Sequence, residues 1–131
     1  MGATNFLESA VLTWILSNYT VYVGYGTADP TETGASAAEP SGGTGFARQA
    51  FEPATVTNSG NDYWAENDNI ITFPTVTSSQ GTITWIYFWD ASTAGNLLAH
   101  ESLANLGLSN INAVTGTIIK FLAQDLRLTA D

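Results

Sequence analysis

The pattern of apolar and polar residues opens with a helical repeat. Six apolar residues recur at helical spacing and cover about half of a helical wheel: Phe6, Leu7, Ala10, Val11, Trp14 and Ile15. Asn5 can cap the first turn, and Glu8, three residues later, completes a capping-box pattern. The sequence therefore predicts one N-terminal amphipathic helix over residues 5–17.

Two leucines lie outside this apolar stripe. Leu12 and Leu16 fall near the opposite side of the wheel, where the other residues are Glu8 and short polar residues. A helix packed on a single sheet needs one apolar face, and this helix has nearly two. We predict that Leu12 and Leu16 contact a partner subunit. The alternative is a helix sunk between its own sheet and a loop.

After Asn18 the apolar period changes from 3.6 residues to two. Residues 19–25 alternate as a strand does, and further short strands are predicted at 46–51, 55–57, 69–73, 82–89, 96–100, 115–121 and 126–129. Gly, Pro and Asn punctuate these segments, and no internal repeat is visible. This pattern predicts an all-β fold, a compact antiparallel β-sandwich of jelly-roll type, with residues 1–131 forming a single domain.

Residues 26–45 form a long loop with five glycines, two prolines and three acidic residues. So few apolar side chains bury too little surface to offset a backbone ordering cost of about 1–2 kcal/mol per residue. We therefore expect the loop to lie against neighbouring protein. Its acidic residues Asp29, Glu32 and Glu39 are the predicted partner contacts.

The charge balance narrows the classes of function. The chain has 3 basic and 12 acidic residues, a net charge of −9, and no cysteine. Three scattered cations cannot neutralise a phosphate backbone or an anionic membrane surface, so we expect no nucleic-acid and no membrane partner. No stretch has the length of a membrane span or the character of a signal peptide. Charged residues make up only 11% of the chain, which suits a surface covered by neighbouring subunits.

Few residues suggest catalysis or metal binding. The only histidine is His100, and no G-x-S-x-G motif accompanies it, so a hydrolase triad and a zinc site are both disfavoured. Asp62, Glu66 and Asp68 lie in the acidic, Asx-rich stretch 58–69 and could bind calcium, but the spacing of a calcium loop is missing. A polar turn is the favoured interpretation. We expect no catalytic residue, no metal and no cofactor.

Aromatic residues gather in the strongest predicted strand. Alternation places Trp85, Tyr87 and Trp89 on one face of residues 82–89. Such an aromatic ledge is either one layer of the sandwich core or a platform on which sugar rings stack.

Arg48 is one of only three cations and lies in the middle of a predicted strand. Alternation places it on the face of Phe46 and Ala50. We predict that its guanidinium forms a structural clamp with a loop carboxylate, Asp29 or Glu32, because a bidentate fork suits that pairing.

Several segments together resemble a family of small tailed-bacteriophage proteins, usually described as phage tail fibre or hypothetical structural proteins. The resemblance runs from about Asn5 to Leu103, through NFLESAVLTWIL, TVYVGYGTADPTETG, SGGTGFARQAF and ITFPTVTSSQGTITWIYFWDASTAGNLL. Two features depart from the family pattern: bulky Tyr87 and Trp89, and a loop lengthened by residues 35–39. The resemblance implies a non-enzymatic virion component and transfers no catalytic residue.

Two placements on the outer surface of the virion follow. The small size, the two-sided helix and the long loop favour an accessory capsid decoration (cement) protein that contacts the major capsid protein or other virion subunits, with copies associating as a homo-oligomer. The alternative is a tail-fibre or tail-appendage subunit that binds host carbohydrate through the aromatic ledge.

Overall fold

The computed structural model describes residues 3–130. Helix α1 (Asn5–Asn18) is capped by Thr4, whose hydroxyl accepts a hydrogen bond of 3.3 Å from the amide of Leu7. The helix therefore lies where the sequence predicts it, but Thr4 and not Asn5 provides the cap. Threonine suits this position because its short side chain reaches back to the unpaired amides of the first turn.

Short strands make up most of the remaining regular structure. They are β1 (Tyr22–Gly26), β2 (Gln49–Ala50), β3 (Ala54–Ser59), β4 (Asp62–Asn67), β5 (Ile71–Thr72), β6 (Gly81–Ile83), β7 (Trp85–Trp89), β8 (Leu97–Ser102), β9 (Ile111–Ala113), β10 (Lys120–Phe121) and β11 (Arg127–Thr129). A short 3₁₀ helix, η1, covers Gly42–Thr44.

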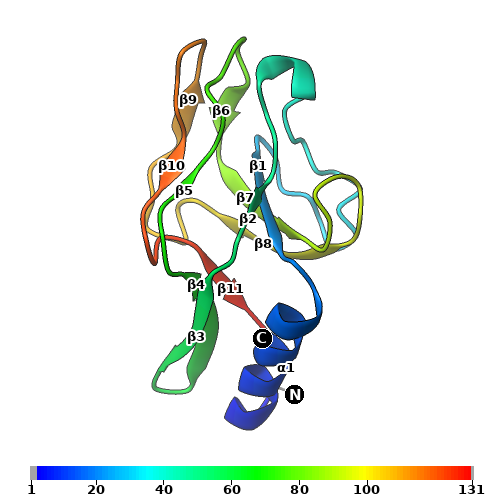
Figure 1. Cartoon of the computed structure of the whole chain (residues 1–131), viewed down its shortest axis with the longest axis vertical. Coiled ribbons are helices and arrows are strands. Elements are labelled where there is room, and N and C mark those ends of the chain that lie inside the picture. Colours follow the sequence, from blue (N-terminus) through cyan, green and yellow to red (C-terminus); the bar gives the residue numbers. More distant parts are fainter. Residues whose placement is uncertain (1–2, 131) are drawn as a thin grey trace.

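All strand pairs are antiparallel. The four-stranded sheet has the order β2-β1-β7-β8, and smaller sheets have the orders β11-β4-β3, β10-β5 and β6-β9. The predicted all-β, antiparallel, sandwich-like fold with one N-terminal helix is confirmed, whereas this strand order does not establish a jelly roll. Figure 1 shows α1 beside the β3–β4 hairpin at one end, with the four small-sheet strands β5, β6, β9 and β10 toward the other end.

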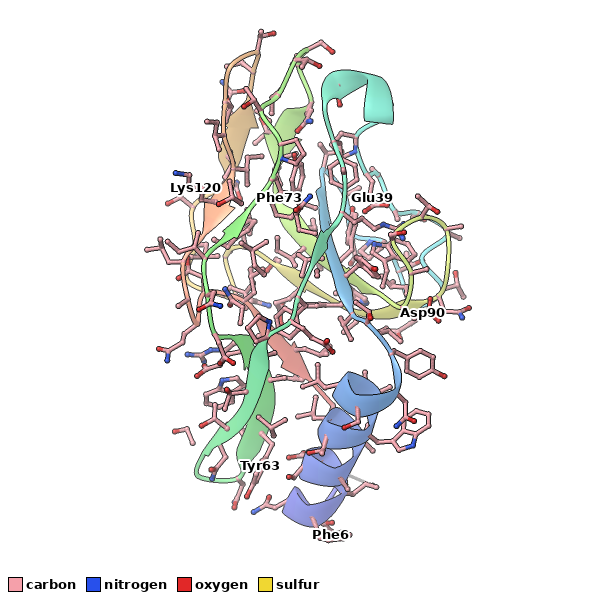
Figure 2. All side chains as sticks on the ribbon, viewed as in Figure 1. Phe6, Glu39, Tyr63, Phe73, Asp90 and Lys120 are labelled. Atoms are coloured by element: carbon pink, nitrogen blue, oxygen red, sulfur yellow. The ribbon has the colours of Figure 1, made fainter. Side chains whose placement is uncertain are left out.

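The core lies between the four-stranded sheet and the smaller sheets. Phe73 is at its centre, with its ring centroid 4.8 Å from that of Tyr25 and 6.0 Å from that of Phe121, both in edge-to-face geometry. Figure 2 shows Phe73 in the interior of the molecule. Phe51 and Phe88 form a second edge-to-face pair at 5.1 Å. Aromatic pairs of this kind add stability beyond the apolar area that they bury.

Some strands differ from the sequence prediction. Residues 62–67 form β4, although their acidic and Asn-rich composition predicts a polar turn. The turn is confined to Gly60 and Asn61, where Gly60 has a φ of 62°. Ala65 and Asn67 lie fully buried in β4, whereas Trp64 and Glu66 are partly exposed, so alternate side chains face inward. Strand propensity depends on such packing more than on composition.

The buried hydroxyl of Tyr25 predicts alkaline sensitivity. It donates a hydrogen bond of 2.8 Å to Oε1 of Gln80, and burial raises the pKa of Tyr25 to about 12, the hydrogen bond opposing this only in part. Unfolded tyrosine titrates near pH 10, so the contribution to stability is complete below pH 10 and is lost between pH 10 and about 12. In Tyr25→Phe, the fall in thermal midpoint between pH 8 and pH 11 should be smaller than in the parent. An equal fall in both proteins would contradict this assignment, and Tyr19→Phe, at an exposed position, is the control.

Candidate functional site

Helix α1 faces the core with the side that carries Leu12 and Leu16, which the sequence analysis assigned to a partner subunit. Leu12 is only 2% exposed and belongs to the hydrophobic core, and Leu16 packs against that core from a half-buried position. The prediction that Leu12 docks on a partner subunit is therefore wrong. Of the alternative, a helix sunk between its own sheet and a loop, only the contact with its own strands is found, because the opposite side of the helix is exposed. The inner side of α1 contacts β3, β4 and β11.

Most of the apolar stripe on the opposite side of α1 is exposed instead, although its Ile15 packs against the core from a half-buried position. Phe6, Leu7, Val11 and Trp14 are 84%, 51%, 39% and 55% exposed, and we call them the outer helix face. Phe6 lies at the free end of α1 in Figure 2. The edge of the Trp14 ring meets Tyr19, with centroids 5.6 Å apart. An apolar patch of this kind, uncovered within its own chain, is typical of an interaction surface.

The aromatic ledge is present, but the chain covers it. Pairing of β1 with β7 sets Gly24 opposite Tyr87 and Gly26 opposite Trp85, which places these residues on the face of the four-stranded sheet that points away from the core. Tyr87 is fully buried, Trp89 is 7% exposed and Trp85 is half-buried. The covering segment is the loop of residues 26–45, so the ledge is neither a layer of the central core nor an open sugar platform.

Two glycines of β1 make room for this cover. A Cβ atom at Gly24 would collide with the carboxylate of Glu39, and one at Gly26 would collide with the hydroxyl of Tyr87 and the carbonyl of Ala38. Gly24 and Gly26 on the outward face of β1 therefore leave a trough along this part of the strand, in which the loop lies. The alternation of residues 23–26 as V-G-Y-G is the sequence signal for it.

The hydroxyl of Tyr87 fastens both ends of the loop. It donates to the carbonyl oxygen of Ala28 and accepts a hydrogen bond of 3.3 Å from the amide of Ala38. The amide of Thr27 donates to the carbonyl of Ala38 at 3.3 Å. Burial is the main cause that raises the pKa of Tyr87 above its usual value. The hydroxyl thus remains protonated and holds the loop closed on the ledge at neutral pH.

Arg48 is the second fastening. Its Nη2 lies 2.7 Å from Oε1 of Glu39, and its Nη1 donates to the carbonyl oxygens of Ala91 and Ala94 at 2.9 and 2.7 Å. Nε also donates to the Glu39 carboxylate at 3.1 Å, and the guanidinium carbon lies 4.1 Å from the ring centroid of Trp89. Because one fork joins the loop, the ledge and the turn after β7, the arrangement ties three segments together.

The partner of this clamp differs from the predicted one. Glu39 takes the place proposed for Asp29 or Glu32, and its side chain is only 16% exposed, so its carboxylate is engaged within the chain. Figure 2 shows Glu39 and Asp90 on the same side of the molecule, where the loop and the turn after β7 meet. The Asp29 turn is closed locally, by a hydrogen bond of 2.9 Å from the amide of Thr31 to Oδ1 of Asp29.

The turn that receives Arg48 has its own support. Oδ1 of Asp90 accepts a hydrogen bond of 2.7 Å from the amide of Asn96, and Oδ2 accepts one of 2.9 Å from its side chain. These bonds hold the pKa of Asp90 below its usual value. Gly95 has a φ of 79°, as expected for a glycine in this turn, and a Cβ there would press on Asp90.

The loop of residues 26–45 is therefore ordered by contacts within the chain. The expectation that it needs a neighbouring protein for order is wrong, because polar contacts with Tyr87 and Arg48 replace the apolar burial that its composition lacks. Asp29 and Glu32 remain exposed, with Oδ1 of Asp29 3.9 Å from Nδ1 of His100. Glu32 and His100 border a shallow pocket of about 340 Å³.

The three acidic residues considered for calcium do not converge. Glu66 accepts a hydrogen bond from the indole of Trp64 at 2.9 Å, and Asp68 accepts one from the hydroxyl of Thr55 at 2.6 Å. Asp62 lies at the exposed end of the β3–β4 hairpin. Within residues 3–130, no three acidic, histidine or cysteine side chains gather as a metal site would require.

The comparisons with known proteins give the context for these surfaces. The model of a family described as Podophage GP4 fiber I protein gp80 matches residues 2–129. The chain belongs to this family. The predicted resemblance to small phage tail-fibre proteins is confirmed, and the family indicates a structural protein of the bacteriophage virion. A search of curated proteins finds no match. In the part of the chain that the structure describes, no helix is long and apolar enough to cross a membrane.

Loss of the Tyr87 hydroxyl should release the loop. Tyr87→Phe removes one donated and one accepted hydrogen bond, with an expected cost of about 1–3 kcal/mol because the partly buried backbone groups of Ala28 and Ala38 lose these bonds. Limited proteolysis should then cleave within residues 26–45 faster than in the parent. Tyr22→Phe is the matched control. Tyr22 lies in β1 on the same face of the sheet as Tyr87, and its substitution should leave the cleavage rate unchanged. Equal cleavage of Tyr87→Phe and the parent would show that the hydroxyl does not hold the loop.

Proposed function

We propose that this protein is a structural subunit of the phage tail fibre, carried on the outer surface of the virion. The observation that supports this most directly is the fibre family match over residues 2–129. The fold supports it as well, because the long loop is fastened by Tyr87 and Arg48 and therefore presents a preformed surface. A fibre subunit binds neighbouring components of the virion, and a surface that is already ordered suits this binding.

The proposed role is non-enzymatic. At Arg48, the most elaborate polar cluster of the described chain, the donors are directed at Glu39, Ala91 and Ala94, which leaves little capacity to bind a substrate. The cluster is a structural clamp in this proposal. Sugar stacking on the aromatic ledge is not part of the proposal, because Tyr87 and Trp89 are covered.

Asp29 and Glu32 are the proposed acidic contacts with other virion subunits. Both are exposed, and the side chain of Asp29 retains 55% of its accessible surface. In a chain of net charge −9, exposed acids of this kind suit a partner surface with basic residues. Glu39 is no longer a candidate contact, because Arg48 occupies its carboxylate.

The competing placement is capsid decoration, in which the protein would contact the major capsid protein. Gold-labelled antibodies raised against this chain and applied to intact particles separate the two. We expect gold at the tail, with none on particles treated with pre-immune serum. Gold distributed over the head would overturn the fibre assignment in favour of capsid decoration.

A further inference from the structure

The two-stranded sheet of β5 and β10 is apolar on both of its faces. Lys120 of β10 pairs with Thr72 of β5, and the amide of Phe73 extends the pairing with a hydrogen bond of 2.9 Å to the carbonyl of Ile119. The inner face belongs to the core and carries Ile71, Phe73, Ile119 and Phe121. An antiparallel sheet with one face in water normally carries polar residues on that face, so a second apolar face is typical of a sheet that is covered on both sides.

The outer face of this small sheet carries four exposed apolar residues. Ile70, Ile118 and Leu122 are 56%, 51% and 58% exposed. Continued past the ends of the two strands, the antiparallel register sets Leu122 opposite Ile70, and Ile118 opposite the exposed Pro74. Single exposed apolar residues are common on protein surfaces, whereas four gathered on one face of a strand pair indicate a contact surface. We call these four residues the outer strand face.

Lys120 lies at the centre of the outer strand face. It is exposed and forms no ion pair with any residue from 3 to 130. The other two cations are engaged within the chain, since Arg48 contacts Glu39 and Arg127 lies over a tryptophan ring. Figure 2 shows Lys120 at the edge of the molecule, away from the side that carries Glu39. Within the described chain, Lys120 is therefore the cation left to meet a partner.

We propose that the outer strand face binds a different protein of the virion, through a carboxylate that is set among apolar side chains. An ammonium group enclosed in an interface is costly unless it meets an opposite charge, so the partner has to supply an acidic group opposite Lys120. The apolar side chains around the pair exclude water and strengthen the attraction between the two charges. The proposal holds whether the protein is placed on the tail or on the head.

Charge favours a different protein over a second copy of this chain. In a two-fold contact the same patch meets itself, which would place Lys120 against its own counterpart. Like charges enclosed by apolar side chains repel one another, and the outer strand face has no acidic residue to compensate. The exposed acids Asp29 and Glu32 of a second copy stand in a loop with few apolar side chains, which cannot cover the four apolar residues.

Lys120 is the only lysine of the chain, so a single chemical reaction can test the contact. A water-soluble carbodiimide joins an amine directly to a carboxylate without a spacer. Applied to intact particles, it should link Lys120 to an aspartate or glutamate of another virion protein, and mass spectrometry of the digested product should identify both residues. In particles that carry Lys120→Arg, the charge is kept but the amine is lost, so this cross-link should disappear.

A variant that moves the lysine is the matched control. Lys120→Arg combined with Arg127→Lys keeps the net charge and places the only lysine on β11, at an exposed position outside the outer strand face. Residue 127 should then form no cross-link to another protein. An equal yield of such cross-links from residue 127 would overturn the proposal, because the reaction would not depend on the outer strand face.

The apolar residues are tested by the number of copies that each particle retains. In Ile118→Ser/Leu122→Ser this number should fall at least about tenfold, because two aliphatic side chains no longer contribute to the contact. The thermal midpoint of the purified variant should match the parent, since both side chains are exposed. Full retention of this variant would overturn the proposal. So would the absence of any cross-link from Lys120 in the parent, or a cross-link that joins only two copies of this chain.

Discussion

Replacement of Arg48 by alanine should destabilise the protein by about 3–5 kcal/mol, because it leaves the carboxylate of Glu39 largely buried without its partner. The side chains of Arg48 and Glu39 are 7% and 16% exposed, so water compensates only in part. The substitution also removes the cation from the Trp89 ring and two hydrogen bonds from the turn after β7. Chemical denaturation measures this loss.

The conservative variant Arg48→Lys separates the contribution of the guanidinium's planar shape to stability from that of its positive charge. Arg48→Lys keeps the positive charge but cannot reproduce a planar fork that serves Glu39, Ala91 and Ala94 together, so a loss of about 2–3 kcal/mol is expected. Arg127→Lys is the matched control. Arg127 also lies over an aromatic ring, Trp64, at 4.4 Å, but it is exposed, so its replacement should cost less than about 1 kcal/mol.

A double variant identifies the cause. Arg48→Met combined with Glu39→Gln removes both charges and should be more stable than Arg48→Ala, since no buried charge is left unpaired. Unfolding free energies equal to the parent for Arg48→Ala and Arg48→Lys would show that the clamp carries no stability.

Truncation of Leu12 should have an effect of similar size. Leu12→Ala removes a side chain that is 2% exposed in the core beneath α1, and the cavity should cost about 2–5 kcal/mol. Leu7→Ala makes the same chemical change in the same helix at a side chain that is 51% exposed. Its effect should stay within about 0.5 kcal/mol.

This pair of variants tests which side of α1 faces the core. Thermal and denaturant unfolding of the two proteins gives the comparison. A larger loss of stability for Leu7→Ala than for Leu12→Ala would mean that the stripe containing Leu7 faces the core.

The case of α1 shows where sequence reasoning reached its limit. The position of the helix could be predicted because caps and apolar spacing are local properties. The predicted range 5–17 begins at the observed first residue and ends one residue early, and only the capping residue is misplaced by one position. Its orientation could not, because both sides of the helix are apolar. The choice depended on how well Leu12 fits against β3, β4 and β11, which are distant in the sequence.

The aromatic ledge shows the same division. Alternation in β7 correctly placed Trp85, Tyr87 and Trp89 on one face, since the period of two follows from backbone geometry. The alternation could not show that the loop of residues 26–45 covers this face. Composition indicated a loop that buries too little to be ordered alone, whereas a hydroxyl and a guanidinium order it through polar contacts that composition does not reveal.

By itself, the sequence determined the fold class, the place of the helix, the family resemblance and the need of Arg48 for a partner. These depend on local periodicity, on motifs and on the scarcity of cations in an acidic chain. Only the tertiary structure decided that the partner is Glu39, that the loop closes over the ledge, and that the outer helix face is exposed. Each of these contacts joins segments that are far apart in the sequence. Local patterns are compatible with several such pairings, and the three-dimensional packing of the segments selects one.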